Sequence, residues 1–137
     1  MTTAMRKLIL RTNGLLLGAF AIFGFVNDLI GYFAGIGSWQ DQWLNNPIMI
    51  GFVEAHGFAM IMAILLFRAS FSQDRRTGHW LGIMTHILLG TANLIFWQLF
   101  LDVNQLPLGY ISTGFHWVFV TLNALSLFLP EEKLLAA

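Results

Sequence analysis

The sequence predicts an all-α integral membrane protein whose single domain, residues 1–137, crosses the bilayer as a four-helix bundle. The first sign is composition: 57% of the residues are hydrophobic and only 10% are charged, against about 25% charged residues in a soluble domain. The second is a set of four apolar stretches, each near the roughly 20 residues that one crossing needs. The third is charge distribution, since all seven Lys and Arg residues fall at helix ends that share one side.

The four predicted helices follow one another through short connections. We place the first at about 8–33 and the second at about 47–67. Pro47 suits the first turn of the second helix, because backbone N–H groups in a first turn make no hydrogen bond within the helix and proline lacks only that group. The third is placed at about 79–101 and the fourth at about 110–129, which Pro130 ends. At about 1.5 Å per residue, each can span a hydrocarbon core of about 30 Å. Similar tripeptides, 16–18 and 88–90, are a weak sign of a duplicated helical hairpin.

The positive charges predict the orientation. They lie at the start of the first helix, between the second and third helices, and after the fourth: Arg6, Lys7, Arg11, Arg68, Arg75, Arg76 and Lys133. The other two connections, 35–46 and 102–109, contain no Lys or Arg. Because cytoplasmic loops are enriched in these residues, we expect both termini in the cytoplasm. The expected location is the cytoplasmic (inner) membrane of a bacterium-like cell, crossed several times.

Net charge and cysteine content narrow the partners. A net charge of zero gives no electrostatic basis for binding nucleic acid. The absence of cysteine excludes disulfides, thiol chemistry and Cys-ligated clusters. The expected partners are therefore the lipid bilayer and a hydrophobic small molecule, while a homo-oligomer or a larger membrane complex stays open.

Polar side chains inside the predicted helices are the best indication of a site. An ionisable group at the bilayer centre costs about 3 kcal/mol or more, so it usually faces the protein interior and marks a function. Such groups, with the amides beside them, are Asp28, Glu54, His56, His86, His116, Asn27, Asn93, Gln98 and Asn123.

The third and fourth helices carry His and Asn residues seven positions apart. Seven residues are close to two helical turns, so these side chains share a face. Because the two helices are antiparallel, we count depth from opposite ends at about 1.5 Å per residue. The count places His86 level with Asn123, which we interpret as a structural polar pair, and Asn93 level with His116, nearer the outer surface.

The first two helices place carboxylates at the outer of these levels. Glu54 comes out level with His116, and Asn27 and Asp28 lie slightly further out. Glu54 and His56 are two residues apart and cannot share a helix face. We expect Glu54 to face His116, because an unpaired carboxylate is costlier to leave facing lipid.

This cluster favours acid–base chemistry on a lipophilic small molecule, of an isomerase, cyclase or hydratase type. A carboxyl group and an imidazole held in apolar surroundings suit this work, because the environment can tune their proton affinities towards neutrality. Glu54, His116 and Asp28 are the expected catalytic residues. The expected substrate contacts are Asn93, Trp97, Asn27, Trp117, Phe115 and Gln98.

Two other classes fit the same residues. His56 and His116 are candidate ligands of a haem iron or, with the carboxylates, of a divalent metal, although no recognised ligand spacing is present. Alternatively, the His and Asn levels are interhelical hydrogen bonds of about 1 kcal/mol each, in a non-catalytic subunit or assembly factor of a membrane complex. The sequence leaves the cofactor open.

Overall fold

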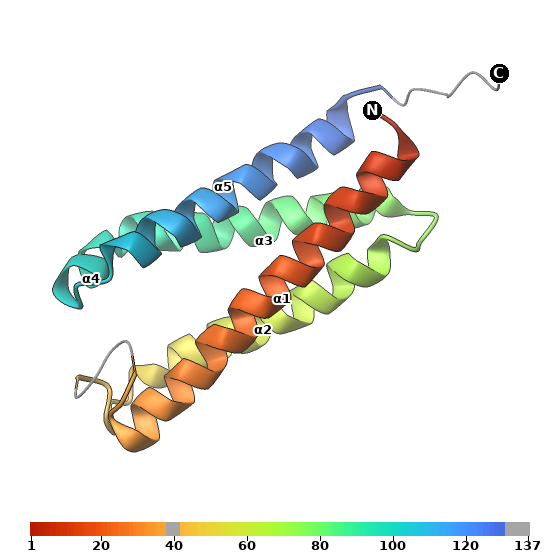
Figure 1. The fold of residues 1–137 in the computed structure, drawn as a ribbon. Helices are drawn as coiled ribbons and strands as arrows, with labels where there is room; N and C mark the ends of the chain where they lie inside the picture. The colour runs from red at the N-terminus through yellow and green to blue at the C-terminus, as the bar shows by residue number, and fades with distance from the viewer. Residues whose placement is uncertain (38–41, 131–137) are drawn as a thin grey trace.

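The computed structural model describes residues 1–37 and 42–130. These residues form five α-helices and no strand, which confirms the all-α class. The helices are α1 (Thr3–Ala34), α2 (Met49–Ala69), α3 (Arg75–Ile95), α4 (Trp97–Asp102) and α5 (Leu106–Phe128). Figure 1 shows two long helical hairpins, α1 with α2 and α3 with α5.

The hairpins meet at one end and diverge towards the other (Figure 1). We call the meeting end the terminal end; it holds the N-terminus, the α2–α3 connection and the end of α5. There the Arg6 guanidinium donates to the Leu129 carbonyl at 2.8 Å. Further along, the Phe20 ring of α1 meets Phe115 of α5 with centroids 5.1 Å apart. The far end holds α4 and the α1–α2 connection.

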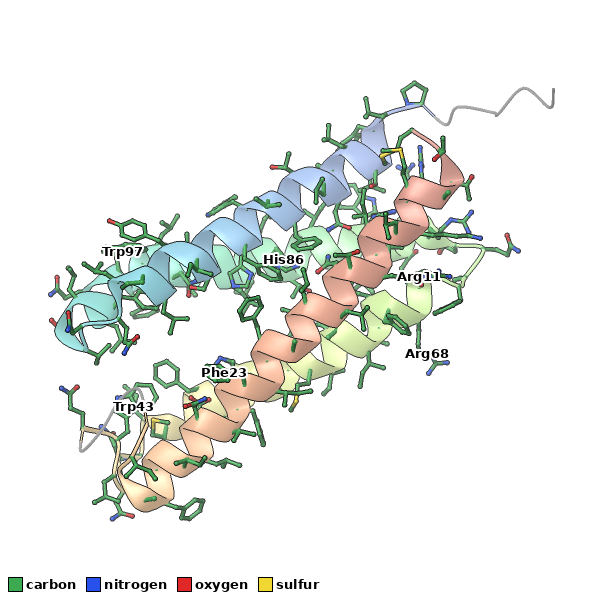
Figure 2. All side chains as sticks on the ribbon, in the orientation of Figure 1. Arg11, Phe23, Trp43, Arg68, His86 and Trp97 are labelled. Carbon is green, nitrogen blue, oxygen red and sulfur yellow. The ribbon has the colours of Figure 1, made fainter. Side chains whose placement is uncertain are left out.

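The Lys and Arg residues of the described part of the chain gather at the terminal end. Figure 2 shows Arg11 and Arg68 there, and Trp43 and Trp97 towards the far end. Arg11 donates to the Ser70 hydroxyl at 3.2 Å, and its guanidinium lies 4.5 Å from the centroid of the Phe71 ring. The side chain of Arg11 is therefore held at the α2–α3 connection.

A repeat of small and apolar residues joins α1 to α2. Apart from Asn13, the buried residues of α1 recur at spacings of three, four or seven: Leu10, Gly14, Leu17, Ala21, Asp28 and Gly31. Ala59, Ala63 and Leu66 continue the same core on α2. Spacing that averages 3.5 residues is typical of helices packed nearly parallel to each other. At Gly14 a Cβ would lie 2.7 Å from the Ala63 carbonyl oxygen, so glycine sets the closest approach of the two backbones.

The third helix differs from its predicted range of 79–101. It begins at Arg75 because Asp74 caps it, accepting bonds from the Thr77 N–H and hydroxyl. The Thr77 hydroxyl bond lowers the pKa of Asp74, so this cap contributes fully above about pH 4 and is lost as the pH falls through the folded pKa. The helix ends at Ile95, and α4 turns so that Phe100 packs on Gly109, where a Cβ would lie 2.9 Å from the Phe100 Cγ.

Three of the described helices, α1, α2 and α5, are long and apolar enough to cross a membrane. Large exposed apolar side chains occur on each of them, among them Leu15, Phe23, Ile64 and Val118. A water-soluble monomer rarely exposes apolar surface on this scale, so the chain has the features of a membrane protein. The buried face of α3 is more polar and includes Gly78, His79, Thr85 and His86.

Candidate functional site

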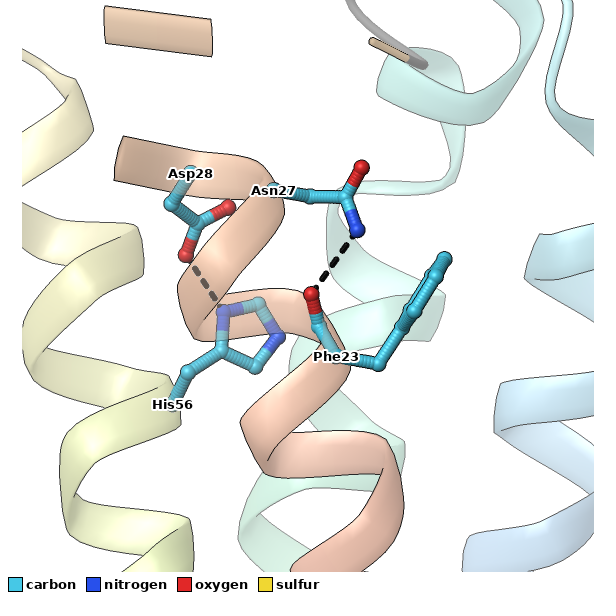
Figure 3. Close-up of polar contacts among 4 residues, drawn as sticks. All are labelled: Phe23, Asn27, Asp28 and His56. Carbon is cyan, nitrogen blue, oxygen red and sulfur yellow. Dashed lines mark hydrogen bonds and ion pairs between the residues drawn. The ribbon is translucent and has the colours of Figure 1, made fainter. Parts of the chain in front are cut away.

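A carboxylate and a histidine meet between the helices of the first hairpin. Asp28 of α1 is 1% exposed, and its Oδ2 lies 2.6 Å from Nδ1 of His56 on α2 (Figure 3). An ionised carboxylate can only accept a hydrogen bond, so a neutral His56 carries its hydrogen on Nδ1 and keeps a lone pair on Nε2. The His56 side chain is 34% exposed. The pair therefore consists of a partly exposed imidazole held in one orientation by a buried carboxylate.

Gly24 makes room for the imidazole of His56. It lies four residues before Asp28, on the same face of α1. A Cβ at this position would lie closest to Nε2 of His56, and 2.5 Å from Cδ2 and 2.6 Å from Cε1, closer than real atoms approach. The histidine ring thus lies directly against the backbone of α1. Gly24 is not among the residues predicted from the sequence, although its spacing of four from Asp28 is a signal that could have identified it.

Asn27 lies next to this pair but bonds within its own helix. Its Nδ2 donates to the Phe23 carbonyl at 2.8 Å (Figure 3). The Phe23 side chain is 60% exposed. Asn27, a predicted substrate contact, is therefore close to the Asp28–His56 pair without being bonded to it.

The prediction that Glu54 faces His116 is wrong. Glu54 is exposed, whereas His56 faces α1. His56, Ala59 and Ala63 continue the three-and-four spacing of the α1–α2 contact, and Glu54 lies two residues before His56 on another face. The helix contact pattern decides which residue turns inward, and it outweighs the cost of leaving a carboxylate unpaired.

A second set of hydrogen-bonded polar side chains lies in the interior, nearer the terminal end. His86 of α3 lies between the hairpins (Figure 2), with Nε2 2.7 Å from Oδ1 of Asn13 and Nδ1 2.9 Å from Nδ1 of His116. The amide oxygen only accepts, so His86 carries its hydrogen on Nε2 and accepts at Nδ1 from His116. Three helices, α1, α3 and α5, are joined by this neutral chain of hydrogen bonds.

The predicted pairing of His86 with Asn123 is also wrong. Asn123 Oδ1 instead accepts from Nδ1 of His79 at 2.8 Å, while its Nδ2 donates to the Phe119 carbonyl at 2.7 Å. Gly82 makes space for this amide, because a Cβ there would lie 2.9 Å from Asn123 Nδ2. The register of α3 against α5 therefore differs from the prediction by one seven-residue repeat. Periodicity alone cannot distinguish these two registers, because both align polar residues of the two helices.

The remaining predicted residues lie apart from the Asp28–His56 pair. Asn93 donates to the Ser112 hydroxyl at 3.0 Å, and Gln98 donates to Asp102 at 2.8 Å on the surface. Phe115 packs against Phe20 and His86. Trp97 and Trp117 line a shallow groove with four neighbours: Leu94, Tyr110, Thr113 and Gly114.

The single outer level that we predicted for Glu54, Asp28, His116 and Asn93 does not form. His116 reaches α1 through His86 at Asn13, whereas Asp28 lies fifteen residues further along that helix. At about 1.5 Å per residue this separation is about 22 Å along α1. The polar groups thus form separate sites.

The candidate haem or metal ligands are likewise separated. Nδ1 of His56 is bonded to Asp28 in the first hairpin, and Nδ1 of His116 to His86 in the second. Within residues 1–37 and 42–130, no three or more His, Asp or Glu side chains are grouped so that they could hold a metal ion. A site using both histidines and both carboxylates is therefore not formed by this arrangement.

Comparison of the chain with protein-family models, curated proteins and solved structures finds no match. The function is therefore inferred from the arrangement of the residues described above.

Proposed function

We propose that the chain crosses the cytoplasmic membrane four times, with both termini in the cytoplasm, and that Asp28 and His56 perform acid–base chemistry on a lipophilic small molecule. The carrying observation is the 2.6 Å contact between a buried carboxylate and a partly exposed imidazole, inside two helices that are apolar enough to cross a membrane. A carboxylate inside the membrane is energetically costly, which argues against a purely structural role for Asp28.

The proposal of four crossings requires that α3 also crosses the membrane, and two features of α3 support this: its length, and the burial of its polar residues against neighbouring helices. The helix has 21 residues, about 31 Å at 1.5 Å per residue, which is enough for the hydrocarbon core. Its two buried histidines, His79 and His86, bond to Asn123, Asn13 and His116 on neighbouring helices. Cations at the terminal end favour a cytoplasmic location for that end.

Labelling of single cysteines tests this topology, because the chain has no cysteine of its own. We expect a membrane-impermeant maleimide, added to intact cells, to label Gln42→Cys and Asp102→Cys but not Gln73→Cys. Residues 42 and 102 lie at the far end, and residue 73 lies in the α2–α3 connection. Permeabilised cells should label all three variants. Labelling of 42 without 102 in intact cells would show that α3 does not cross.

The proposed chemistry is a proton shuttle. Nε2 of His56 takes a proton from one atom of the substrate, and the imidazolium returns it to another atom of the same molecule, so no co-reactant is needed. Asp28 accepts the Nδ1–H bond, fixes the ring orientation and stabilises the imidazolium while it exists. Such a cycle serves an isomerisation or a cyclisation. A lipophilic substrate suits the site because large exposed apolar side chains occur on both helices, among them Phe23 of α1 and Phe58 of α2.

Comparing membrane lipid extracts tests the chemistry even while the substrate is unidentified. In the organism that makes the protein, we expect Asp28→Asn and His56→Ala to make one lipophilic species accumulate and an isomer of it disappear. Glu54→Gln is the matched control, because it alters an exposed carboxyl group on the same helix as His56 and should leave the extract unchanged. Unchanged extracts for Asp28→Asn and His56→Ala at normal protein levels would refute the catalytic role and favour a non-catalytic subunit.

A further inference from the structure

Four buried polar atoms have no protein partner among the described residues, and two of them lie near the starts of α1 and α3 at the terminal end. These two are Nε2 of His79, on a side chain that is 1% exposed, and Nε of Arg6. Buried polar atoms are nearly always hydrogen-bonded, to protein or to ordered water. The two atoms belong to different hairpins, His79 to α3 and Arg6 to α1.

The hydrogen bonds of Asn123 fix which kind of atom His79 offers. Asn123 donates its Nδ2 to the Phe119 carbonyl, which can only accept, so the amide oxygen faces His79. His79 therefore donates from Nδ1, and the neutral ring keeps a lone pair on Nε2. Arg6 Nε, by contrast, is always a donor. The two unpartnered atoms are thus an acceptor and a donor.

Packing brings the helix turns that carry these two residues next to each other. A Cβ on Gly78 would lie 3.4 Å from the Leu10 methyl groups, so this turn of α1 lies on the first turn of α3. Arg6 is one turn before Leu10, and His79 directly follows Gly78. The Arg6 guanidinium also lies near enough to act electrostatically on His79, while its NH2 group is anchored at the Leu129 carbonyl.

We propose that an internal water molecule bridges Arg6 and His79 and joins the two hairpins at their terminal end. The water accepts from Arg6 Nε–H and donates to His79 Nε2, which satisfies both atoms at once. This water bridge is independent of the proposed function at Asp28 and His56. It adds a polar link between the hairpins to those from Arg6 to Leu129 and from His86 to Asn13.

Magnetic resonance of the full chain in lipid bilayers, with histidine labelled by ¹⁵N, tests the bridge. The chain has four histidines, so their signals can be assigned by single substitutions. We expect magnetisation from water to reach Nε2 of His79, which should resonate as an unprotonated nitrogen. Both nitrogens of His86 are bonded to protein and should receive none. No transfer to His79 would overturn the proposal.

A pair of conservative substitutions assigns the donor. Arg6→Lys keeps the cation but removes the Nε–H, and we expect loss of the water contact at His79. Arg75→Lys is the matched control, because Arg75 also acts electrostatically on His79 but donates to the Ser72 carbonyl. Unchanged His56 signals will show that the variants are folded. Persistence of the contact in Arg6→Lys would show that Arg6 Nε–H is not the donor, and a direct ¹⁵N contact between Arg6 and His79 would show that no water lies between them; either result would refute the bridge.

Discussion

Replacing Gly24 with alanine is expected to lower the free energy of unfolding by about 3 kcal/mol, the scale of leaving a buried charged group without its hydrogen-bond partner. The new Cβ would overlap the imidazole of His56, with Nε2 as the nearest atom and Cδ2 2.5 Å away. The ring must move away from α1, and Asp28, at 1% exposed, then loses its partner. Reversible unfolding in detergent micelles, followed by helix content, measures the loss.

Gly114→Ala is the matched control for this substitution. Gly114 is a helical glycine of α5, and a Cβ there has no atom within 4 Å. Since alanine is favoured over glycine in a helix by about 1 kcal/mol, this variant should be as stable as the unchanged chain or slightly more stable. If Gly24→Ala behaved like Gly114→Ala, His56 would not lie against α1.

Replacing His86 with leucine is expected to cost about 3 kcal/mol, because two buried groups lose their partners together. Asn13 Oδ1 and His116 Nδ1 both bond to His86, and a buried polar group left unpaired costs about 1–3 kcal/mol. The same unfolding experiment measures the effect. It should also loosen the two hairpins, since His86 is the described residue that links Asn13 of α1 to His116 of α5.

A double substitution separates this cause from a general packing defect. In Asn13→Leu with His86→Leu, the unpaired amide is removed as well, so the double variant should be more stable than the sum of the two single losses predicts. Strictly additive losses would show that Asn13 and His86 do not interact. The predicted sign of the coupling follows only from a direct bond between them.

The sequence was sufficient to predict the helices because hydropathy and length act locally. The ranges of α2 and α5 are close to those predicted, and α1 begins earlier because Thr2 caps it through the Met5 N–H. The break at Phe96 was not predictable, since no proline or glycine marks it. It depends on the packing of Phe100 against Gly109, which are neighbours only in the folded chain.

The polar partners were harder to predict because they depend on register. His79, His86 and Asn93 repeat every seven residues, as do His116 and Asn123, so a shift by one repeat still aligns polar residues. The structure makes that shift, pairing His79 with Asn123 and His86 with His116. Asn13 of α1, which is not among the predicted site residues, bonds to His86 in this register.

The choice between Glu54 and His56 had a similar difficulty. Both are polar residues at nearly the same depth, and only the contact face of α2 distinguishes them. That face follows from small residues such as Ala59 and Ala63 meeting α1. The sequence predicts Asp28 as a site residue because a carboxylate at membrane depth is costly. The structure buries it beside His56, and its catalytic role stays a prediction.

The most direct test of the Asp28–His56 site is ¹⁵N magnetic resonance of the four histidines in bilayers, comparing the unchanged chain with Asp28→Asn. The structure predicts that Nδ1 of His56 is protonated and strongly hydrogen-bonded, and that the substitution shifts the His56 nitrogens alone. His79, His86 and His116 bond to other partners and should not respond. Unshifted His56 signals, or a response at His116 instead, would contradict the pairing of Asp28 with His56 on which the proposed function depends.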